Sequence, residues 1–276
     1  MDRLAPNDTA ALHTTVVNDA VSIEREEGLG WVVLTRPGQI NAINDDIRHG
    51  VPQALRELDA DPAIRVILIR GAGERGFCAG ADIKEKRATE TAIEVRRRMQ
   101  GARWIEAIDA VQKPVIAAVH GYCMGGGLEL ALACDIRYAA PDAVFSLPET
   151  ALGLIPGGGG TQRLARVVGP GRAMDLLLTG ERLSAGAARD IGLVTRIASE
   201  SGTLQDEVRA FALRIAARAP AATLSVKRAA RSAGELELKQ GLDLELDLFA
   251  MLKPSEDARE AALAFSEKRP PHFTGR

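Results

Sequence analysis

Apolar residues in the first part of the chain fall into short continuous runs that favour strands. The runs at 64–70 and 114–119 are rich in Val and Ile and are bounded by Gly or Pro, which predicts buried strands. Two further runs, 21–26 and 31–36, are separated by glycines and predict a hairpin. Strong helix formers without a breaker predict a helix over 128–134. Strands that alternate with helices in this way indicate an α/β fold.

Beyond Pro220 the apolar pattern changes to helical spacing. No strand is predicted over 221–269, where apolar residues recur at the intervals of amphipathic helices. The apolar faces of such helices would be exposed if they had no partner. We therefore expect a loose N-terminal arm over 1–20, a core over 21–220, and a C-terminal helical region over 221–276.

A junction rich in glycine is the first candidate for chemistry. Three consecutive glycines, 125–127, connect the predicted strand at 114–119 to the predicted helix at 128–134. Glycines let a ligand approach the backbone closely, and the first N–H groups of a helix favour negative charge. Glu129 lies at the start of that helix. The sequence therefore predicts an anion-binding turn with a carboxylate beside it.

A second carboxylate, Glu149, follows a turn at 141–142 and a predicted strand at 143–147. A helix followed by a short hairpin would fold Glu149 back over Glu129. Paired carboxyl groups near an apolar pocket have their pKa values pushed apart, which leaves one better suited as acid and the other as base. Either glutamate alone could equally be a solvated surface residue, so the pair is a hypothesis.

Gly71, Gly73 and Gly76 match the G-x-G-x-x-G fingerprint of dinucleotide-binding folds. In those folds the glycine turn opens directly into a helix. Here irregular residues precede the next helix-compatible stretch, 82–86, and the acidic residues farther on do not follow a second strand. We therefore do not favour a dinucleotide site.

Four segments in order carry a resemblance to a known family: Phe77–Glu85, Gly121–Glu129, Phe145–Glu149 and Leu154–Leu164. Together they resemble the enoyl-CoA hydratase (crotonase) superfamily, and the resemblance covers the chain from about Val21 to Arg276. It implies a ClpP-like spiral of β-β-α repeats that ends near Pro220. It also implies that the C-terminal helices pack between subunits, in a homotrimer or in a hexamer formed as a dimer of trimers.

The resemblance also implies roles for individual residues. The backbone N–H groups of Ala81 and Gly126 would form an oxyanion hole for the thioester oxygen, and one such donor is typically worth about 3 kcal/mol. Glu129 would mainly activate water, and Glu149 would deliver a proton to C2. Two coupled carboxyl groups need not divide these roles cleanly.

Coenzyme A contacts are implied by the same segments. Lys84 would begin a helix and meet the nucleotide phosphates, and the backbone of 79–83 would line the adenine. The C-terminal segment 265–269 would reach a CoA in the same or a neighbouring subunit. Lys84 could instead be a solvated lysine, and Phe265 could be ordinary core. The implied substrate- and CoA-binding residues are Ala79, Ala81, Asp82, Ile83, Lys84, Gly126, Phe265 and Lys268.

The implied activity is that of a hydro-lyase that adds water across the 2,3 double bond of a trans-2-enoyl-CoA and forms a 3-hydroxyacyl-CoA, as in fatty acid β-oxidation. No cofactor is expected, because coenzyme A is part of the substrate. Other acyl-CoA reactions stay open, including methylglutaconyl-CoA or carnitinyl-CoA hydration, isomerisation and decarboxylation. A non-catalytic binding role is a further alternative.

Composition excludes several other classes of protein. The chain has 276 residues, 46% of them hydrophobic, and a net charge of −2, which suits one or two globular domains. No apolar run approaches a membrane span, and residues 1–20 contain aspartates but no apolar segment of a signal peptide, so we expect a cytoplasmic protein without membrane contact. The arginines at 96–98, in a helix expected over about 93–108, indicate a solvated helix face rather than a nucleic-acid site, because no set of stacking aromatics accompanies them.

The residue types that bind metals do not occur at ligand spacings. The three cysteines show no Cys-x-x-Cys pattern, which predicts reduced thiols in a reducing compartment rather than disulfides. The four histidines are scattered along the chain. We therefore expect no metal.

Overall fold

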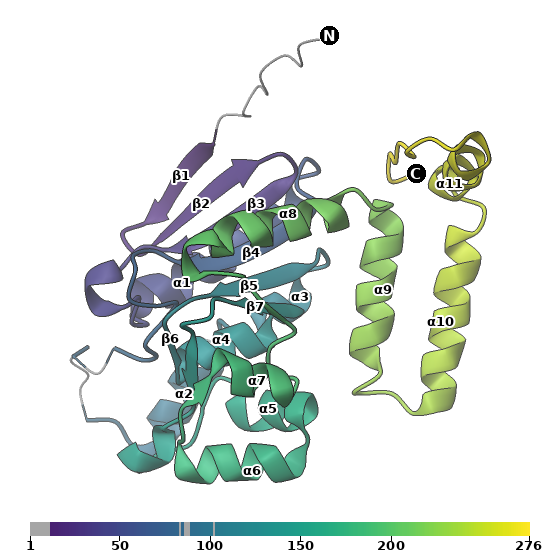
Figure 1. Ribbon diagram of the computed structural model, residues 1–276. Coiled ribbons are helices and arrows are strands. Elements are labelled where there is room, and N and C mark those ends of the chain that lie inside the picture. The colour runs from purple at the N-terminus through teal and green to yellow at the C-terminus, as the bar shows by residue number, and fades with distance from the viewer. Residues whose placement is uncertain (1–11, 83, 86–88, 102) are drawn as a thin grey trace.

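A computed structural model describes residues 12–82, 84–85, 89–101 and 103–276 of the chain (Figure 1). Its larger sheet has the strand order β1-β2-β3-β4-β5-β7-β10. The first three strands pair antiparallel and the later ones parallel. The strands are β1 His13–Asn18, β2 Val21–Glu26, β3 Leu29–Leu34, β4 Val66–Gly71, β5 Val115–Val119, β7 Ile136–Ala139 and β10 Arg196–Ile197.

Alternate side chains of the larger sheet enter two separate cores. In β3, Trp31 and Val33 pack with the apolar residues of α8, whereas Val32 and Leu34 pack toward α1 on the opposite face. All six residues of β3 are buried, as expected for a strand that is covered on both faces. Figure 1 shows α8 lying across this sheet.

A second sheet, of order β6-β8-β9, is built from shorter strands that follow those of the larger sheet. Its strands are β6 Tyr122–Met124, β8 Val144–Ser146 and β9 Leu183–Ser184. The chain passes from β5 to β6 and into α4, and then from β7 to β8 and onward to α5. This repeated path from one sheet to the other and then to a helix confirms the expected spiral of β-β-α turns.

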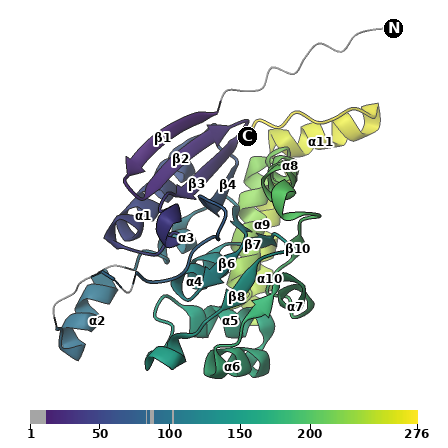
Figure 2. The same cartoon turned by 60° about the vertical axis from the view of Figure 1, so that its left-hand side comes forward.

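Helices cover both sheets and form the C-terminal region (Figures 1 and 2). The α-helices are α1 Asp45–Ala60, α2 Ala92–Gly101, α3 Ala107–Ala110, α4 Gly126–Ala133, α5 Gly160–Val168, α6 Pro170–Thr179, α7 Ala185–Asp190, α8 Leu204–Ala216, α9 Pro220–Ser232, α10 Leu238–Leu252 and α11 Glu256–Glu267. Single 3-10 turns are η1 Pro37–Gln39, η2 Glu149–Leu152 and η3 Ser201–Thr203.

The C-terminal helices are held to the core by charged side chains of α9. Lys227 Nζ lies 2.9 Å from the Asp135 carboxylate, and Arg231 Nε donates to the same carboxylate at 2.8 Å. Beyond α9, helix α10 packs antiparallel to it and carries exposed apolar residues at helical spacing: Leu238, Leu242, Leu246 and Phe249. The change of pattern at Pro220 coincides with the first residue of α9. The division of the chain into three parts stays a prediction.

Three local expectations are wrong. A loose arm was predicted over 1–20, but residues 13–18 within it form β1, which pairs with β2 at the edge of the larger sheet. The described residues of 82–86 form a turn and a bend rather than a helix, and the Lys84 amide donates to the Asp82 carboxylate. The helix expected over 93–108 is two helices, α2 and α3.

Candidate active site

The junction of β6 and α4 places Glu129 inside the protein. Gly125 has a φ of 50°, a conformation that favours glycine, and α4 begins at the next residue. Glu129 falls in the first turn of that helix and is only 5% exposed. The predicted strand-to-helix turn with a carboxylate at its start is therefore present.

Two backbone amides hold one oxygen of Glu129. Its Oε1 accepts hydrogen bonds from Gly158 N at 2.7 Å and Gly160 N at 2.8 Å. Burial raises the pKa of Glu129, while these two bonds and the charge of Arg163 act in the opposite direction. The carboxylate is thus a stronger base than an exposed glutamate, and its orientation is fixed.

Glu149 reaches the same place from the second sheet. It begins η2 three residues after the end of β8, which pairs parallel with β6. A β-carbon built at Gly125 would lie 3.0 Å from Glu149 Oε1. Glu149 therefore borders the turn that leads into the helix of Glu129. The predicted hairpin is wrong, because β7 and β8 belong to different sheets and the parallel pairing of β8 with β6 brings the two carboxyl groups together.

The two carboxyl groups differ in their hydrogen bonds. Glu149 Oε2 is buried and has no hydrogen-bond partner among the described residues, whereas Glu129 Oε1 has two donors. Burial raises the pKa of Glu149, a hydrogen bond from its own backbone N–H lowers it, and the negative charge of Glu129 raises it. Burial thus makes each carboxyl group keep a proton more readily than an exposed glutamate does, and the amides of Gly158 and Gly160 fix the orientation of Glu129 alone.

The segment that carries Ala81 lies close to the amide of Gly126. Gly126 is the first residue of α4, where an N–H group has no partner within the helix. A β-carbon built at Gly80 would lie 3.5 Å from Gly126 N, so the segment of Ala81 passes directly over the helix start.

The direction of the Ala81 amide follows from its pairing. The residues on either side of Ala81 bond to Ile43: Ile43 N donates to Gly80 O at 2.8 Å, and Asp82 N donates to Ile43 O at 3.0 Å. Since the flanking residues face Ile43, the amide of Ala81 faces the opposite side. The N–H of Ala81 therefore points away from Ile43, on a segment that lies against the start of α4.

A buried asparagine supports this segment. The Asn41 side chain is fully buried, donates to the carbonyls of Ala72, Gly76 and Phe77 at 3.0 to 3.1 Å, and accepts from Arg36 N. Its φ of 54° lies in the left-handed region, which Asn tolerates better than most residues. The Arg36 guanidinium in turn pairs with Asp82 at 2.9 Å.

The residues predicted to bind CoA are divided between two places. Ala79, Asp82 and Lys84 lie on the segment of Ala81, with Ala79 and Lys84 exposed and the Asp82 carboxylate paired with Arg36. Ile83 lies outside the described residues.

Phe265 and Lys268 lie far from that segment within one chain. Phe265 is 87% exposed on α11, so it is not core, and Lys268 ends the same helix. In both ribbon views α11 stands beyond α9 and α10, apart from α4 and β6 (Figures 1 and 2).

The roles of Gly158, Gly160 and Asn41 were not predicted from the sequence. The run of glycines at 157–160 was the signal available for the first two. A β-carbon built at Gly158 would lie 2.8 Å from Glu129 Oε2, so the carboxyl group packs directly against this run. Asn41 carried no such signal, because its partners are carbonyls more than thirty positions away.

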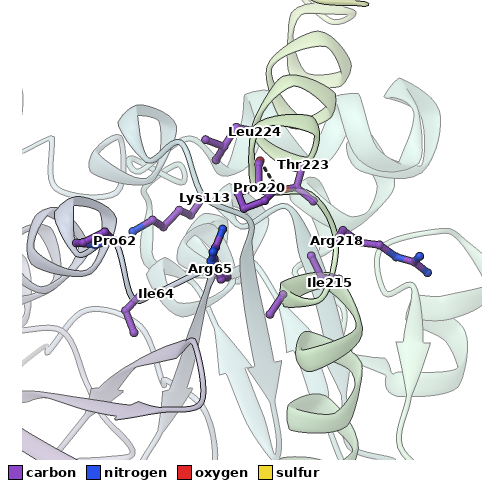
Figure 3. A pocket seen from close by; sticks show the side chains of 10 residues that line it. Pro62, Ile64, Arg65, Lys113, Ile215, Arg218, Pro220, Thr223 and Leu224 are labelled. Atoms are coloured by element: carbon purple, nitrogen blue, oxygen red, sulfur yellow. Dashed lines mark hydrogen bonds between the residues drawn. The ribbon is translucent and has the colours of Figure 1, made fainter. Parts of the chain in front are cut away.

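A cavity of about 110 Å³ lies elsewhere, at the junction of α8 and α9 (Figure 3). The residues that line it are Pro62, Ile64, Arg65, Lys113, Ile215, Ala216, Arg218, Pro220, Thr223 and Leu224. They include no carboxylate, and Lys113 Nζ donates to the carbonyls of Leu58 and Asp61. This cavity therefore has no acid–base pair of the kind formed by Glu129 and Glu149.

The three cysteines are free, as the sequence predicted, and all three are buried. Burial raises the pKa of Cys78 and of Cys134 to about 12, so these thiols are unreactive at neutral pH. No metal-binding group of three or more His, Cys, Asp or Glu occurs in the part of the chain that the structure describes. Within the same residues, every helix is too short or too polar to cross a bilayer.

Comparison with known proteins adds independent information. A family model described as enoyl-CoA hydratase/isomerase matches residues 24–276. The chain is 42% identical to a probable enoyl-CoA hydratase of Mycobacterium tuberculosis, over 94% of this chain and 99% of that protein. It is 39% identical to a crotonyl-CoA hydratase of Syntrophomonas wolfei, over 92% of this chain and 97% of that protein.

Solved structures give the same result. The crystal structure of an enoyl-CoA hydratase from Bacillus anthracis superposes with a TM-score of 0.88 at 36% identity, covering 93% of this chain and 100% of that one. A structure of an enoyl-CoA hydratase from Geobacillus kaustophilus gives a TM-score of 0.87 at 38% identity, covering 93% and 98%.

Proposed function

Since the chain belongs to the enoyl-CoA hydratase/isomerase family, we propose that it adds water across the 2,3 double bond of a trans-2-enoyl-CoA and forms a 3-hydroxyacyl-CoA. The observation that carries this proposal is the pair of carboxyl groups, Glu129 and Glu149, at a turn bordered by two backbone amides. The enzyme is a hydro-lyase, and the specific class that we propose is enoyl-CoA hydratase, EC 4.2.1.17.

The two amides polarise the substrate. The thioester oxygen accepts hydrogen bonds from Ala81 N–H and Gly126 N–H, which draws electron density from the double bond and makes C3 electrophilic. As attack proceeds, negative charge collects on that oxygen. Fixed backbone donors stabilise this charge without reorganisation, and each is typically worth about 3 kcal/mol.

The two glutamates supply acid and base. Glu129 is oriented by hydrogen bonds from Gly158 N and Gly160 N and, in its carboxylate form, removes a proton from the water that attacks C3. Glu149, whose pKa burial raises and whose Oε2 has no hydrogen-bond donor among the described residues, holds a proton and delivers it to C2. The proton that Glu129 has gained then returns Glu149 to its starting state, so the net reaction adds one water molecule.

A direct assay tests this proposal. Crotonyl-CoA loses the ultraviolet absorbance of its conjugated thioester when water adds, and mass spectrometry identifies the product. We expect a 3-hydroxyacyl-CoA whose formation is lost when Glu129 is replaced by Gln. An isomer of unchanged mass would indicate double-bond migration instead.

We further propose a preference for short acyl groups. A β-carbon built at Gly157 would lie 2.7 Å from Met99 Cε, and one at Gly158 would lie 2.6 Å from Ile105 Cδ1. Side chains of α2 and of the segment before α3 therefore crowd the turn beside Glu129. The names of two relatives, a crotonyl-CoA hydratase and a short-chain-enoyl-CoA hydratase, support the same preference. A series of enoyl-CoA chain lengths would test it, with kcat/KM expected to be highest for the four-carbon substrate.

Coenzyme A binding is proposed for two segments. Ala79, Asp82, Ile83 and Lys84 adjoin the amide of Ala81 in sequence, and the exposed ammonium of Lys84 would meet the nucleotide phosphates. Phe265 and Lys268 lie too far from Glu129 in one chain, so they would reach a CoA that is bound by a neighbouring subunit.

The apolar face of α10 supports self-association. Leu238, Leu242, Leu246 and Phe249 are each more than half exposed in the single chain. We propose that this face packs between subunits in a homotrimer or a dimer of trimers, because such a row of large apolar side chains is costly to leave in water. Sedimentation should show a trimer or hexamer for the full chain, and Leu242→Glu should shift it toward monomer.

The remaining proposals are that the enzyme needs no cofactor beyond the CoA of its substrate and that it acts in the cytoplasm. The first follows from a reaction that moves only protons and water. The reduced cysteines support the second.

A further inference from the structure

An arginine on α5 lies against the turn that holds Glu129. The side chain of Arg163 folds back over Gly159, where a β-carbon would lie only 3.0 Å from Arg163 Nε. Gly159 stands between Gly158 and Gly160, whose amides both donate to Glu129 Oε1. The backbone N–H of Arg163 also donates to Gly159 O at 2.8 Å. Arg163 thus contacts the turn with both its backbone and its side chain.

The guanidinium of Arg163 is fixed from the other side by Asp109. It makes two parallel hydrogen bonds, from Nη1 to Asp109 Oδ1 at 3.0 Å and from Nη2 to Oδ2 at 2.5 Å. A bidentate pair of this kind fixes orientation as well as distance. Asp109 lies in α3, just beyond Ile105, which itself contacts Gly158.

The same aspartate is tied to the C-terminal region. Arg231 Nη1 of α9 lies 3.3 Å from Asp109 Oδ1, and its Nη2 donates to Ala133 O, at the end of α4, at 2.8 Å. Helices α3, α4, α5 and α9 therefore meet at one charged cluster, which consists of Asp109, Arg163 and Arg231.

We propose that Arg163 is a positioning residue for Glu129: its pair with Asp109 holds the turn at 158–160, and thus the two amides that orient the Glu129 carboxyl group, in place. This inference rests on the proposed role of Glu129 as the base. The interaction goes beyond that role, because Arg163 touches neither substrate nor reacting atoms and acts through the two amides.

The electrostatic part of the inference has a definite direction. Among the described residues, the charged groups that act on the Glu129 carboxyl are Arg163 from α5 and Glu149 from η2. The positive charge of Arg163 lowers the pKa of Glu129 and thus opposes the effect of burial. Without that charge, the base takes up its proton at a higher pH.

Three variants separate position from charge. Arg163→Gln removes both the bidentate pair and the positive charge. We expect kcat to fall by about tenfold to a hundredfold, since a misplacement of a catalytic group by about 1 Å costs on the order of a hundredfold. The acid limb of the kcat profile should also move to higher pH. Asp109→Asn breaks the pair but keeps the positive charge, so kcat should fall while the acid limb stays in place. Arg163→Lys keeps the positive charge but cannot form the bidentate pair. Its acid limb should therefore match that of the wild type, and its kcat should lie between those of the wild type and Arg163→Gln.

Arg209→Gln is the matched control. Arg209 makes ion pairs with Glu26 and Glu27 on the far side of the larger sheet, so its loss should leave kcat and the pH profile unchanged. KM for crotonyl-CoA should change by less than a few-fold in every variant. Circular dichroism and sedimentation on each full-length variant show whether the fold and assembly are kept.

A folded Arg163→Gln enzyme with wild-type kcat and an unmoved acid limb would overturn the inference. So would an equal loss in Arg209→Gln. Glu129→Gln distinguishes this failure from that of the proposed function: if it is inactive while Arg163→Gln is normal, only the positioning role is wrong, whereas an active Glu129→Gln contradicts the role of Glu129 itself.

Discussion

Replacement of Glu129 by glutamine should separate activity from stability. The amide oxygen of Gln can still accept from Gly158 N and Gly160 N, so the shape of the site is kept. The variant loses its basicity. General-base catalysis contributes about 10² to 10⁴ in rate, which corresponds to about 3 to 5 kcal/mol of transition-state stabilisation. We therefore expect kcat to fall at least a hundredfold, with KM nearly unchanged.

The same substitution should not destabilise the protein at neutral pH. Burial raises the pKa of Glu129 in the folded state. A carboxyl group with a raised folded pKa stabilises the fold fully below its unfolded pKa of about 4.3, and this stabilisation is lost as pH rises through the folded pKa. At pH 7 the buried carboxylate thus lowers the free energy of unfolding, and the neutral amide removes that penalty. Tm should be equal to or higher than that of the wild type, and the gain should shrink toward pH 4.

Glu207 gives a matched contrast of opposite sign. Hydrogen bonds from Ser199 and Thr203 lower its pKa to about 2, so its contribution to stability is present above about pH 4.3 and is lost as pH falls toward 2. Glu207→Gln should lower Tm at pH 7 and leave kcat unchanged. Thermal unfolding and crotonyl-CoA hydration, measured on both variants, give the comparison. The reasoning is refuted if Glu129→Gln hydrates within a few-fold of wild type, or if it loses Tm as Glu207→Gln does.

Three further changes test other parts of the site and fold. Glu149→Gln should lower kcat at least a hundredfold with little change in CoA affinity, because the C2 proton donor is lost; a few-fold effect would contradict its role. Gly126→Pro removes one oxyanion donor and should cost about a hundredfold or more in kcat in a variant shown to fold by circular dichroism, whereas a near wild-type rate would show that the donor lies elsewhere. Deletion of 221–276 removes Lys227 and Arg231 from Asp135 and should give an insoluble or strongly destabilised product, and a soluble folded monomer seen by sedimentation would contradict this.

Local pattern was sufficient to predict most of the framework. The strands at 21–26 and 115–119 and the helix that carries Glu129 follow from continuous apolar runs and breaker residues, which act over a few positions. The amphipathic spacing beyond Pro220 likewise predicted helices with exposed apolar faces, as α10 now shows. Both features depend on near neighbours in the sequence.

Features that depend on distant contacts could not be predicted in this way. Glu149 reaches Glu129 because β8 pairs parallel with β6, and no local signal distinguishes that pairing from the hairpin that we expected. The segment after Ala81 is compatible with a helix by composition, yet the Asp82 carboxylate accepts from the Lys84 amide and pairs with Arg36, which favours a turn. The amides of Gly158 and Gly160 donate to Glu129, which is about thirty positions away in the sequence, so their role could not be predicted from the glycine run alone.

The measurement that tests the account most directly is the mass of the product formed from crotonyl-CoA in water enriched in heavy oxygen. If Glu129 activates water for attack on C3 and Glu149 supplies the proton at C2, the wild-type enzyme should give a 3-hydroxyacyl-CoA that carries one heavy oxygen on its acyl chain, and neither glutamine variant should form it at an appreciable rate. A product without added oxygen, or labelled product from both variants at the wild-type rate, would contradict the two-carboxylate hydratase.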